Sequence, residues 1–157
     1  MPAEALVLDA NLLVLLIVGT TSEAYISRHK RLRAFTVNDF RLLTTRLSAA
    51  AQVWVTPNTV TEASNLAGQI NEPARTHIFA VFRGLLRKLR EFYVPSLHAS
   101  EQKAILRLGV TDAGLLLADF ADHVLMTVDL DLYLEAGRLK RKAINFNHYI
   151  EANRTTG

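Results

Sequence analysis

The sequence contains no cysteine among its 157 residues. This absence excludes a disulfide scaffold, a zinc-thiolate site and a cysteine nucleophile, and it is typical of a protein kept in a reducing compartment. Any metal bound by this chain must therefore be held by oxygen or imidazole ligands.

The sequence also lacks a hydrophobic run long enough to cross a bilayer. Its longest uncharged run, Ala10 to Gly19, falls well short of the roughly 20 apolar residues that a transmembrane helix needs. Met1 to Glu4 carries no basic side chain, whereas a secretory signal peptide begins with a positively charged region. We therefore expect a cytoplasmic protein without membrane association.

What is present is the composition of a globular protein. Half of the residues are hydrophobic and 21% are charged, and the length suits a single domain over residues 1–157. The net charge is only +3, yet the basic residues gather in groups. These groups are Arg28, Lys30, Arg31 and Arg33; Arg83, Arg87, Lys88 and Arg90; and Arg138, Lys140, Arg141 and Lys142.

Short apolar or β-branched segments alternate with helical patterns along the chain. Strands are expected at 5–8, 52–56, 123–128 and 142–146, with a loop or short strand at 93–97. Helices are expected at 10–18, 22–31, 38–51, 59–70, 73–92, 100–108, 112–121 and 130–136. This alternation predicts an α/β domain with three α-β-α layers around a central, mainly parallel sheet of four to five strands.

Four acidic residues occupy equivalent places in this pattern. Asp9 and Asp129 close the first strand and the strand 123–128. Glu62 falls in the first turn after the strand 52–56, and Asp112 opens the helix that leads into 123–128. In a parallel sheet, strand ends and helix starts share one rim, where ligands bind. We therefore expect the four carboxylates to converge there.

Each acid also has a structural explanation. Glu62 fits a capping box with Thr59, Asp112 suits the helix dipole, and Asp9 and Asp129 suit N-caps. Ionised carboxylates in close contact, however, repel by about 4 kcal/mol per pair at an effective dielectric near 20, whereas a helix dipole contributes at most about 2 kcal/mol. A gathered set therefore needs a cation, and oxygen ligands favour Mg²⁺ or Mn²⁺.

Four stretches carry these acids: "LVLDANLL", "VTPNTVTEASNL", "LGVTDAGLLLA" and "VLMTVDLDLY". In order and spacing the chain resembles the PIN-domain family, metal-dependent ribonucleases that include the toxins of many bacterial toxin-antitoxin pairs. The resemblance extends over about residues 5–133 and is strong only at these stretches. The segment 71–103 is longer than in the smallest toxins, and Leu132 stands where an aromatic residue often follows the last acid.

The resemblance implies a catalytic metal pocket with polar supports. The implied catalytic residues and metal ligands are Asp9, Glu62, Asp112 and Asp129, and the implied supports are Asn11 and Thr127. It further implies an RNA substrate, a homodimer and, for toxin-like members, an antitoxin protein as partner. Asp131 is a rival for the fourth acidic position, but it is expected to face solvent, as is Asp119.

The predicted function is that of a Mg²⁺-dependent endoribonuclease, in which metal-activated water attacks an RNA phosphodiester. In this interpretation some basic groups flank the acidic rim and bind RNA phosphates. The candidates are Arg28, Arg31, Arg138 and Arg141.

Other classes of protein combine this architecture with an acidic pocket. A receiver-like signalling domain needs adjacent acids after the first strand, but Ala10 follows Asp9. A phosphatase of the haloacid dehalogenase type needs a second acid where Asn11 stands. A non-catalytic Mg²⁺-binding interaction domain is a further alternative, and it ranks below catalysis because all four acids are present.

Overall fold

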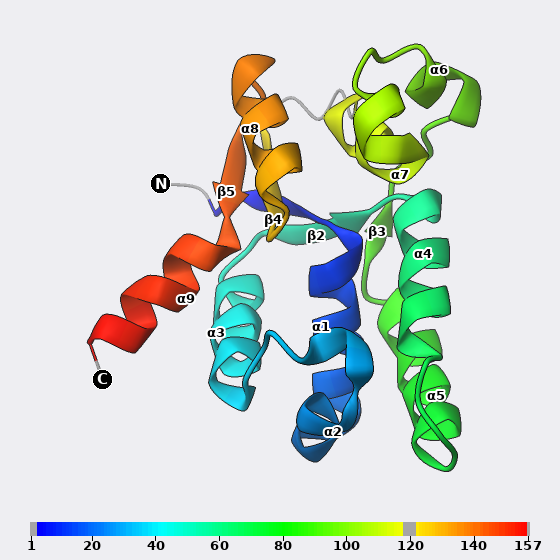
Figure 1. The fold of residues 1–157 in the computed structure, drawn as a ribbon, viewed down its shortest axis with the longest axis vertical. Coiled ribbons are helices and arrows are strands. Elements are labelled where there is room, and N and C mark those ends of the chain that lie inside the picture. Colours follow the sequence, from blue (N-terminus) through cyan, green and yellow to red (C-terminus); the bar gives the residue numbers. More distant parts are fainter. Residues whose placement is uncertain (1–2, 118–121, 157) are drawn as a thin grey trace.

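The computed structural model describes residues 3–117 and 122–156, and within them a five-stranded parallel sheet forms the centre (Figure 1). The strands are β1 (Ala5–Leu8), β2 (Gln52–Val55), β3 (Arg90–Glu91), β4 (His123–Thr127) and β5 (Ala143–Asn145). They lie in the order β3-β2-β1-β4-β5, and all neighbours are parallel. The chain thus winds in one direction from β1 to β3 and in the other from β4 to β5. The switch point between β1 and β4 is where such sheets bind ligands.

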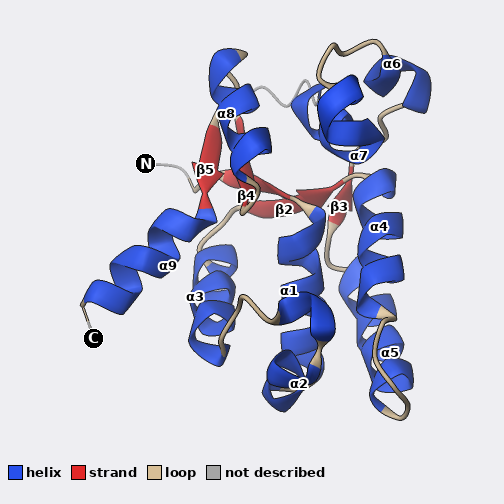
Figure 2. Cartoon of the chain, viewed as in Figure 1, coloured by secondary structure: helices blue, strands red, loops and turns tan. Residues whose placement is uncertain are grey.

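Helices cover both faces of the sheet, so the predicted three-layer α-β-α fold is confirmed (Figure 2). One face carries α1 (Ala10–Thr21), α2 (Glu23–Arg28), the short 3₁₀ helix η1 (Lys30–Leu32), α3 (Val37–Ser48), α4 (Pro57–Ala67), α5 (Ala74–Leu86) and α9 (Phe146–Thr155). The other face carries α6 (Ser96–Ser100), α7 (Ile105–Leu117) and α8 (Leu130–Arg138). No helix within 3–117 and 122–156 is both long and apolar enough to span a membrane.

Alternation along the central strands builds two hydrophobic cores. On β1, Leu6 and Leu8 belong to the larger core around α1, whereas Val7 belongs to the smaller core beneath α7 and α8. On β4, Met126 and Leu125 divide between the same two cores. Successive strand residues point to opposite faces of a sheet, so a helix layer on each side buries residues 6–8 of β1 and 124–127 of β4.

Helix α4 begins two residues earlier than its sequence pattern indicates. Pro57 occupies its first turn, where the absent N–H costs nothing. The hydroxyl oxygen of Thr56 caps the helix by accepting a hydrogen bond from the backbone N–H of Thr59 at 3.1 Å. The expected start at Thr59 is therefore wrong, and Glu62 lies in the second turn instead of in a capping box.

Three further differences concern segments with weak periodicity. The helix expected over 73–92 ends at Leu86, and the edge strand β3 follows it. Helix α9 was not expected, and α7 combines parts of two expected helices across a kink at Gly109, whose φ is +84°. The last part of the helix expected at 112–121, residues 118–121 with Asp119, falls outside the described residues.

The close approach of α1 and α3 gives a first testable prediction. A Cβ atom added at Gly19 would lie 2.6 Å from Cγ of Phe40 and closer still to the ring edge. We expect Gly19→Ala to lower the free energy of unfolding by about 1–3 kcal/mol, because overpacking must push the two helices apart. Urea denaturation measures this change.

Gly84→Ala in α5 is the matched control. A Cβ there meets no atom within 4 Å, and alanine favours a helix interior over glycine by about 1 kcal/mol. This variant should be as stable as the wild type or more so. Equal stability of Gly19→Ala and the wild type would mean that the α1–α3 contact is looser than described.

Candidate metal centre

Asp9 lies at the junction of β1 and α1, and its side chain is only 3% exposed. One carboxylate oxygen, Oδ1, caps α1 by accepting a hydrogen bond from the backbone N–H of Leu12 at 2.9 Å. The other oxygen, Oδ2, accepts from the backbone N–H of Val128 at 3.0 Å and from the hydroxyl of Thr127. The carboxylate thus joins the end of β1 to the turn after β4.

Thr127 and Asp129 complete this junction. The buried Thr127 hydroxyl donates to Asp9 and accepts from the backbone N–H of Asp129 at 2.9 Å. Asp129 caps α8, since its Oδ1 accepts from the backbone N–H of Leu132 at 2.9 Å. The N-cap explanation is therefore correct for Asp9 and for Asp129, and it coexists with their proximity to each other.

Asp112 and Glu62 reach the same rim from helices on opposite faces of the sheet. Asp112 is half-buried on α7, three residues after the kink at Gly109, and Glu62 is exposed on α4. Helices α4 and α7 are in contact. Glu62 on α4 and Asp112 on α7 thus supply two carboxylates to the rim. The N-cap residues of α1 and α8, Asp9 and Asp129, supply the other two.

The pKa values of Asp112 and Asp9 reflect both burial and the neighbouring acids. Burial, together with the negative charges of Asp129, Asp9 and Glu62, raises the pKa of Asp112 to about 7. Burial also raises the pKa of Asp9, although hydrogen bonds from Thr127, Leu12 and Val128 oppose the shift. A negative charge raises a neighbour's pKa more strongly the closer it lies, so Asp9, Glu62 and Asp129 all lie near enough to Asp112 to act on its carboxyl.

The carboxylates fit a hard divalent cation by their chemistry. In the described part of the chain no three acidic or histidine side chains are already spaced to hold a metal ion. Mg²⁺, however, usually keeps several waters and takes only one or two protein carboxylates. A carboxylate offers about four lone-pair positions; Asp9 uses three of them, whereas Asp129 uses one on its helix cap.

The predicted RNA-binding arginines lie in two separate places. Arg28 stacks on the ring of Tyr25, 5.3 Å from its centroid, and Arg31 donates from Nε to Gln69 at 2.8 Å. Arg138 is paired with Glu135 at the end of α8, and the guanidinium of Arg141 donates to the carbonyl of His123, the first residue of β4, at 2.6 Å. Arg141 therefore lies at the amino ends of the strands, whereas the acids lie at their carboxyl ends.

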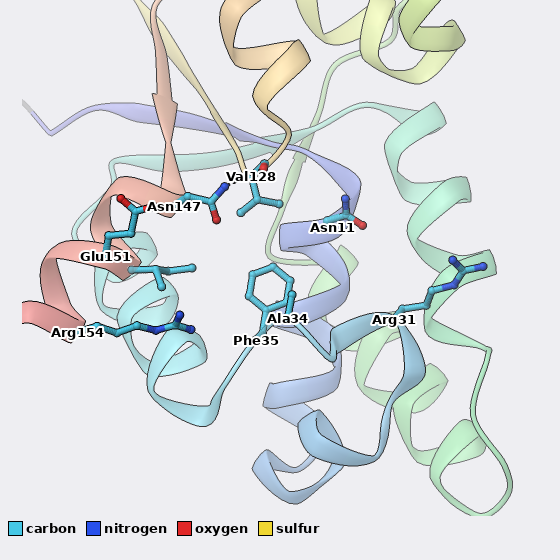
Figure 3. A pocket seen from close by; sticks show the side chains of 9 residues that line it. Asn11, Arg31, Ala34, Phe35, Val128, Asn147, Glu151 and Arg154 are labelled. Atoms are coloured by element: carbon cyan, nitrogen blue, oxygen red, sulfur yellow. Dashed lines mark hydrogen bonds between the residues drawn. The ribbon is translucent and has the colours of Figure 1, made fainter.

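A polar cavity of about 420 Å³ adjoins the acidic rim (Figure 3). Asn11, a predicted support, lies at its border on α1 and is exposed. Asn147 on α9 also lines it and donates from Nδ2 to the carbonyl of Val128 at 2.9 Å. Asn147 was not predicted from the sequence because α9 was not expected; the signal for this helix is the capping residue Asn145 before it.

Comparison of the chain with protein-family models and with curated proteins finds no match. The PIN-domain resemblance therefore remains a prediction from four short motifs.

The raised pKa of Asp112 predicts a pH-dependent effect of Asp112→Asn on stability without metal. The ordinary value is 3.8 and the folded value is about 7, so the carboxyl favours folding fully below pH about 4 and loses this contribution as the pH rises through about 7. In EDTA, the stability of Asp112→Asn relative to the wild type should therefore rise between pH 4 and 8. Urea denaturation across this range measures it.

Asp131→Asn is the control for this titration, because Asp131 is exposed on the first turn of α8. Its stability relative to the wild type should change much less over the same pH range. A flat difference for Asp112→Asn would show that neither burial nor the neighbouring charges raise the pKa of Asp112.

Asp9→Asn should behave differently from Asp112→Asn. An amide at position 9 has only one acceptor oxygen, so either the N–H of Leu12 or that of Val128 loses its partner. We expect a loss of about 1–3 kcal/mol in the free energy of unfolding at neutral pH, the usual cost of a buried unpaired group. If urea denaturation finds no loss, the three hydrogen bonds to Asp9 do not hold this junction together.

Proposed function

We propose that this chain is a Mg²⁺- or Mn²⁺-dependent endoribonuclease with a PIN-like fold. One observation carries the proposal: at the switch point of a parallel sheet, the charges of Asp129, Asp9 and Glu62 act on the half-buried carboxyl of Asp112. Such a gathering is unfavourable unless a cation neutralises it. Hard cations held by carboxylates commonly act on phosphate groups.

In this proposal Asp9, Glu62, Asp112 and Asp129 form the pocket that holds the metal, either directly or through the waters that Mg²⁺ usually keeps. When bound, Mg²⁺ supplies an activated water and stabilises the charge that develops on a phosphodiester during in-line attack. Asp9 is held rigidly by its three hydrogen bonds, and Thr127 orients both Asp9 and Asp129. Glu62 is exposed and free to adjust to the substrate, and Asp112 can hold or release a proton near neutral pH.

The remaining parts of the proposal concern substrate and partners. Arg28 and Arg31 follow α1 on its face of the sheet and are exposed, which supports a role in holding RNA phosphates. Arg138 and Arg141 would contact RNA only if the RNA extended from the acids to the amino ends of the strands. We further propose a cytoplasmic, toxin-like enzyme that forms a homodimer and is inhibited by an antitoxin protein.

A non-catalytic or receiver-like Mg²⁺-binding domain is the second candidate. It is favoured by the capping roles of Asp9 and Asp129, because each residue stabilises the start of a helix without any need for catalysis. This candidate predicts metal binding without any cleavage of RNA.

Glu62→Gln and Asp112→Asn are the sharpest tests of the enzyme, because neither side chain is a helix cap in the structure. We expect each change to lower Mg²⁺-dependent cleavage of single-stranded RNA by at least about 100-fold, since loss of even an outer-shell partner costs about 10- to 100-fold. Gel analysis of a labelled RNA, with circular dichroism to verify folding, measures the effect. EDTA should abolish the activity of the wild type, and Mn²⁺ should restore it.

Asp131→Asn, prepared in parallel, should retain the activity of the wild type and thereby excludes a contaminating nuclease as the source of any difference. Full activity in either Glu62→Gln or Asp112→Asn would refute the assignment. Binding of Mg²⁺ without cleavage by the wild type would favour the non-catalytic candidate.

A further inference from the structure

We propose that the cavity beside the acidic rim holds one unpaired nucleobase of the RNA, next to the phosphate that is cut (Figure 3). This inference rests on the proposed function and adds a substrate subsite to it. The volume of the cavity, about 420 Å³, lies within the usual range for small-molecule sites.

The position of the cavity follows from Val128. This residue lines the cavity, and its backbone N–H donates to Asp9 at 3.0 Å. Its neighbours in the chain are Thr127 and Asp129, both part of the acidic junction. Val128 therefore borders both the cavity and the acidic rim. A nucleotide whose phosphate lies at the acids has its base within reach of the cavity.

Phe35 gives the cavity an aromatic wall. Its backbone N–H is bound to the carbonyl of Leu32 at 2.9 Å, which fixes the segment after η1. The ring is half-buried against the larger core, and Figure 3 shows it between the side chains of α9 and Asn11 of α1. Stacking on such a ring is the usual way in which proteins hold single-stranded bases, because every base has a π-face.

Asn147 provides a hydrogen-bond acceptor for the base. Its Nδ2 donates to the carbonyl of Val128 at 2.9 Å, and this bond fixes the orientation of the amide, since the opposite orientation would place two oxygens together. Figure 3 shows Oδ1 turned toward the space above Phe35. An acceptor there suits the exocyclic amino group of adenine, cytosine or guanine, a group that uracil lacks.

The charges around the cavity favour a base over a phosphate. The guanidinium of Arg154 is bound to Asp39 at 3.2 Å, and Glu151 lies one turn away on the same helix. The guanidinium of Arg31 points away toward α4, where it binds Gln69. These groups largely offset one another, so no strong positive field remains to hold an anion inside.

The experiment compares Phe35→Leu with the wild type in binding a fluorescent oligoadenylate, measured by anisotropy in EDTA, where RNA is not cut. We expect binding to weaken about 5- to 100-fold, the effect of removing one base-aromatic stack. The dependence on salt should stay unchanged, because no charge is altered. Oligouridylate should bind the wild type more weakly than oligoadenylate.

Two variants separate stacking from general damage. Phe35→Tyr keeps the aromatic face and should bind like the wild type. Phe79→Leu removes another half-buried phenylalanine that packs on the same core but lies on α5, away from the cavity. It should lose a similar amount of stability without any loss of binding.

The outcomes distinguish this inference from the proposed function. If the wild type cuts RNA in Mg²⁺ and Phe35→Leu binds and cuts equally well, the base site is wrong and the nuclease stands. If Phe35→Leu weakens binding but the wild type cuts no RNA, the base site stands and the nuclease is wrong. A wild type that binds no oligoadenylate overturns the base site.

Discussion

The rim of this protein depends on a single buried carboxylate. Asp9 is almost completely shielded from water, and a dry, unpaired charge there would cost several kcal/mol. Hydrogen bonds from Leu12, Val128 and Thr127 offset that cost, and bonds to an ionised acceptor are stronger than neutral ones. They also fix the ends of β1 and β4 relative to each other. The position where the strand order reverses is thus held by side-chain chemistry as well as by the sheet.

Asp112 on α7 and Asp129 at the start of α8 bring two of the acids to the rim from the same helix layer, so the geometry of the rim depends on how these two helices are held together. The buried Glu135 on α8 binds Arg107 on α7 at 3.1 Å and also binds Arg138. The hydrogen bond from Arg138 lowers the pKa of Glu135, so the carboxylate stays ionised. This arrangement ties α7 to α8 independently of the acids that the two helices bring to the rim.

The sequence predicted the large elements and the four acids because both produce regular signals. Apolar runs identified β1, β2, β4 and β5, and parallel topology then placed the acids at one rim. The structure departs from the sequence pattern where a few contacts decide the outcome. Strand β3 consists of Arg90 and Glu91 alone, and α9 buries little beyond Phe146 and Ile150. Sequence periodicity could not show that Asp9 both caps a helix and joins two strands, because the second role needs Val128, far along the chain.

The two outer strands of the sheet constrain how this protein can associate. Strand β3 has two residues, both charged and exposed, and β5 has three. Short edge strands offer few backbone groups for another strand to pair with, and short strands and charged side chains, as in β3, protect a sheet from edge-to-edge aggregation. A second copy or a partner protein is therefore expected to dock on the helices, leaving the sheet closed to extension from either side.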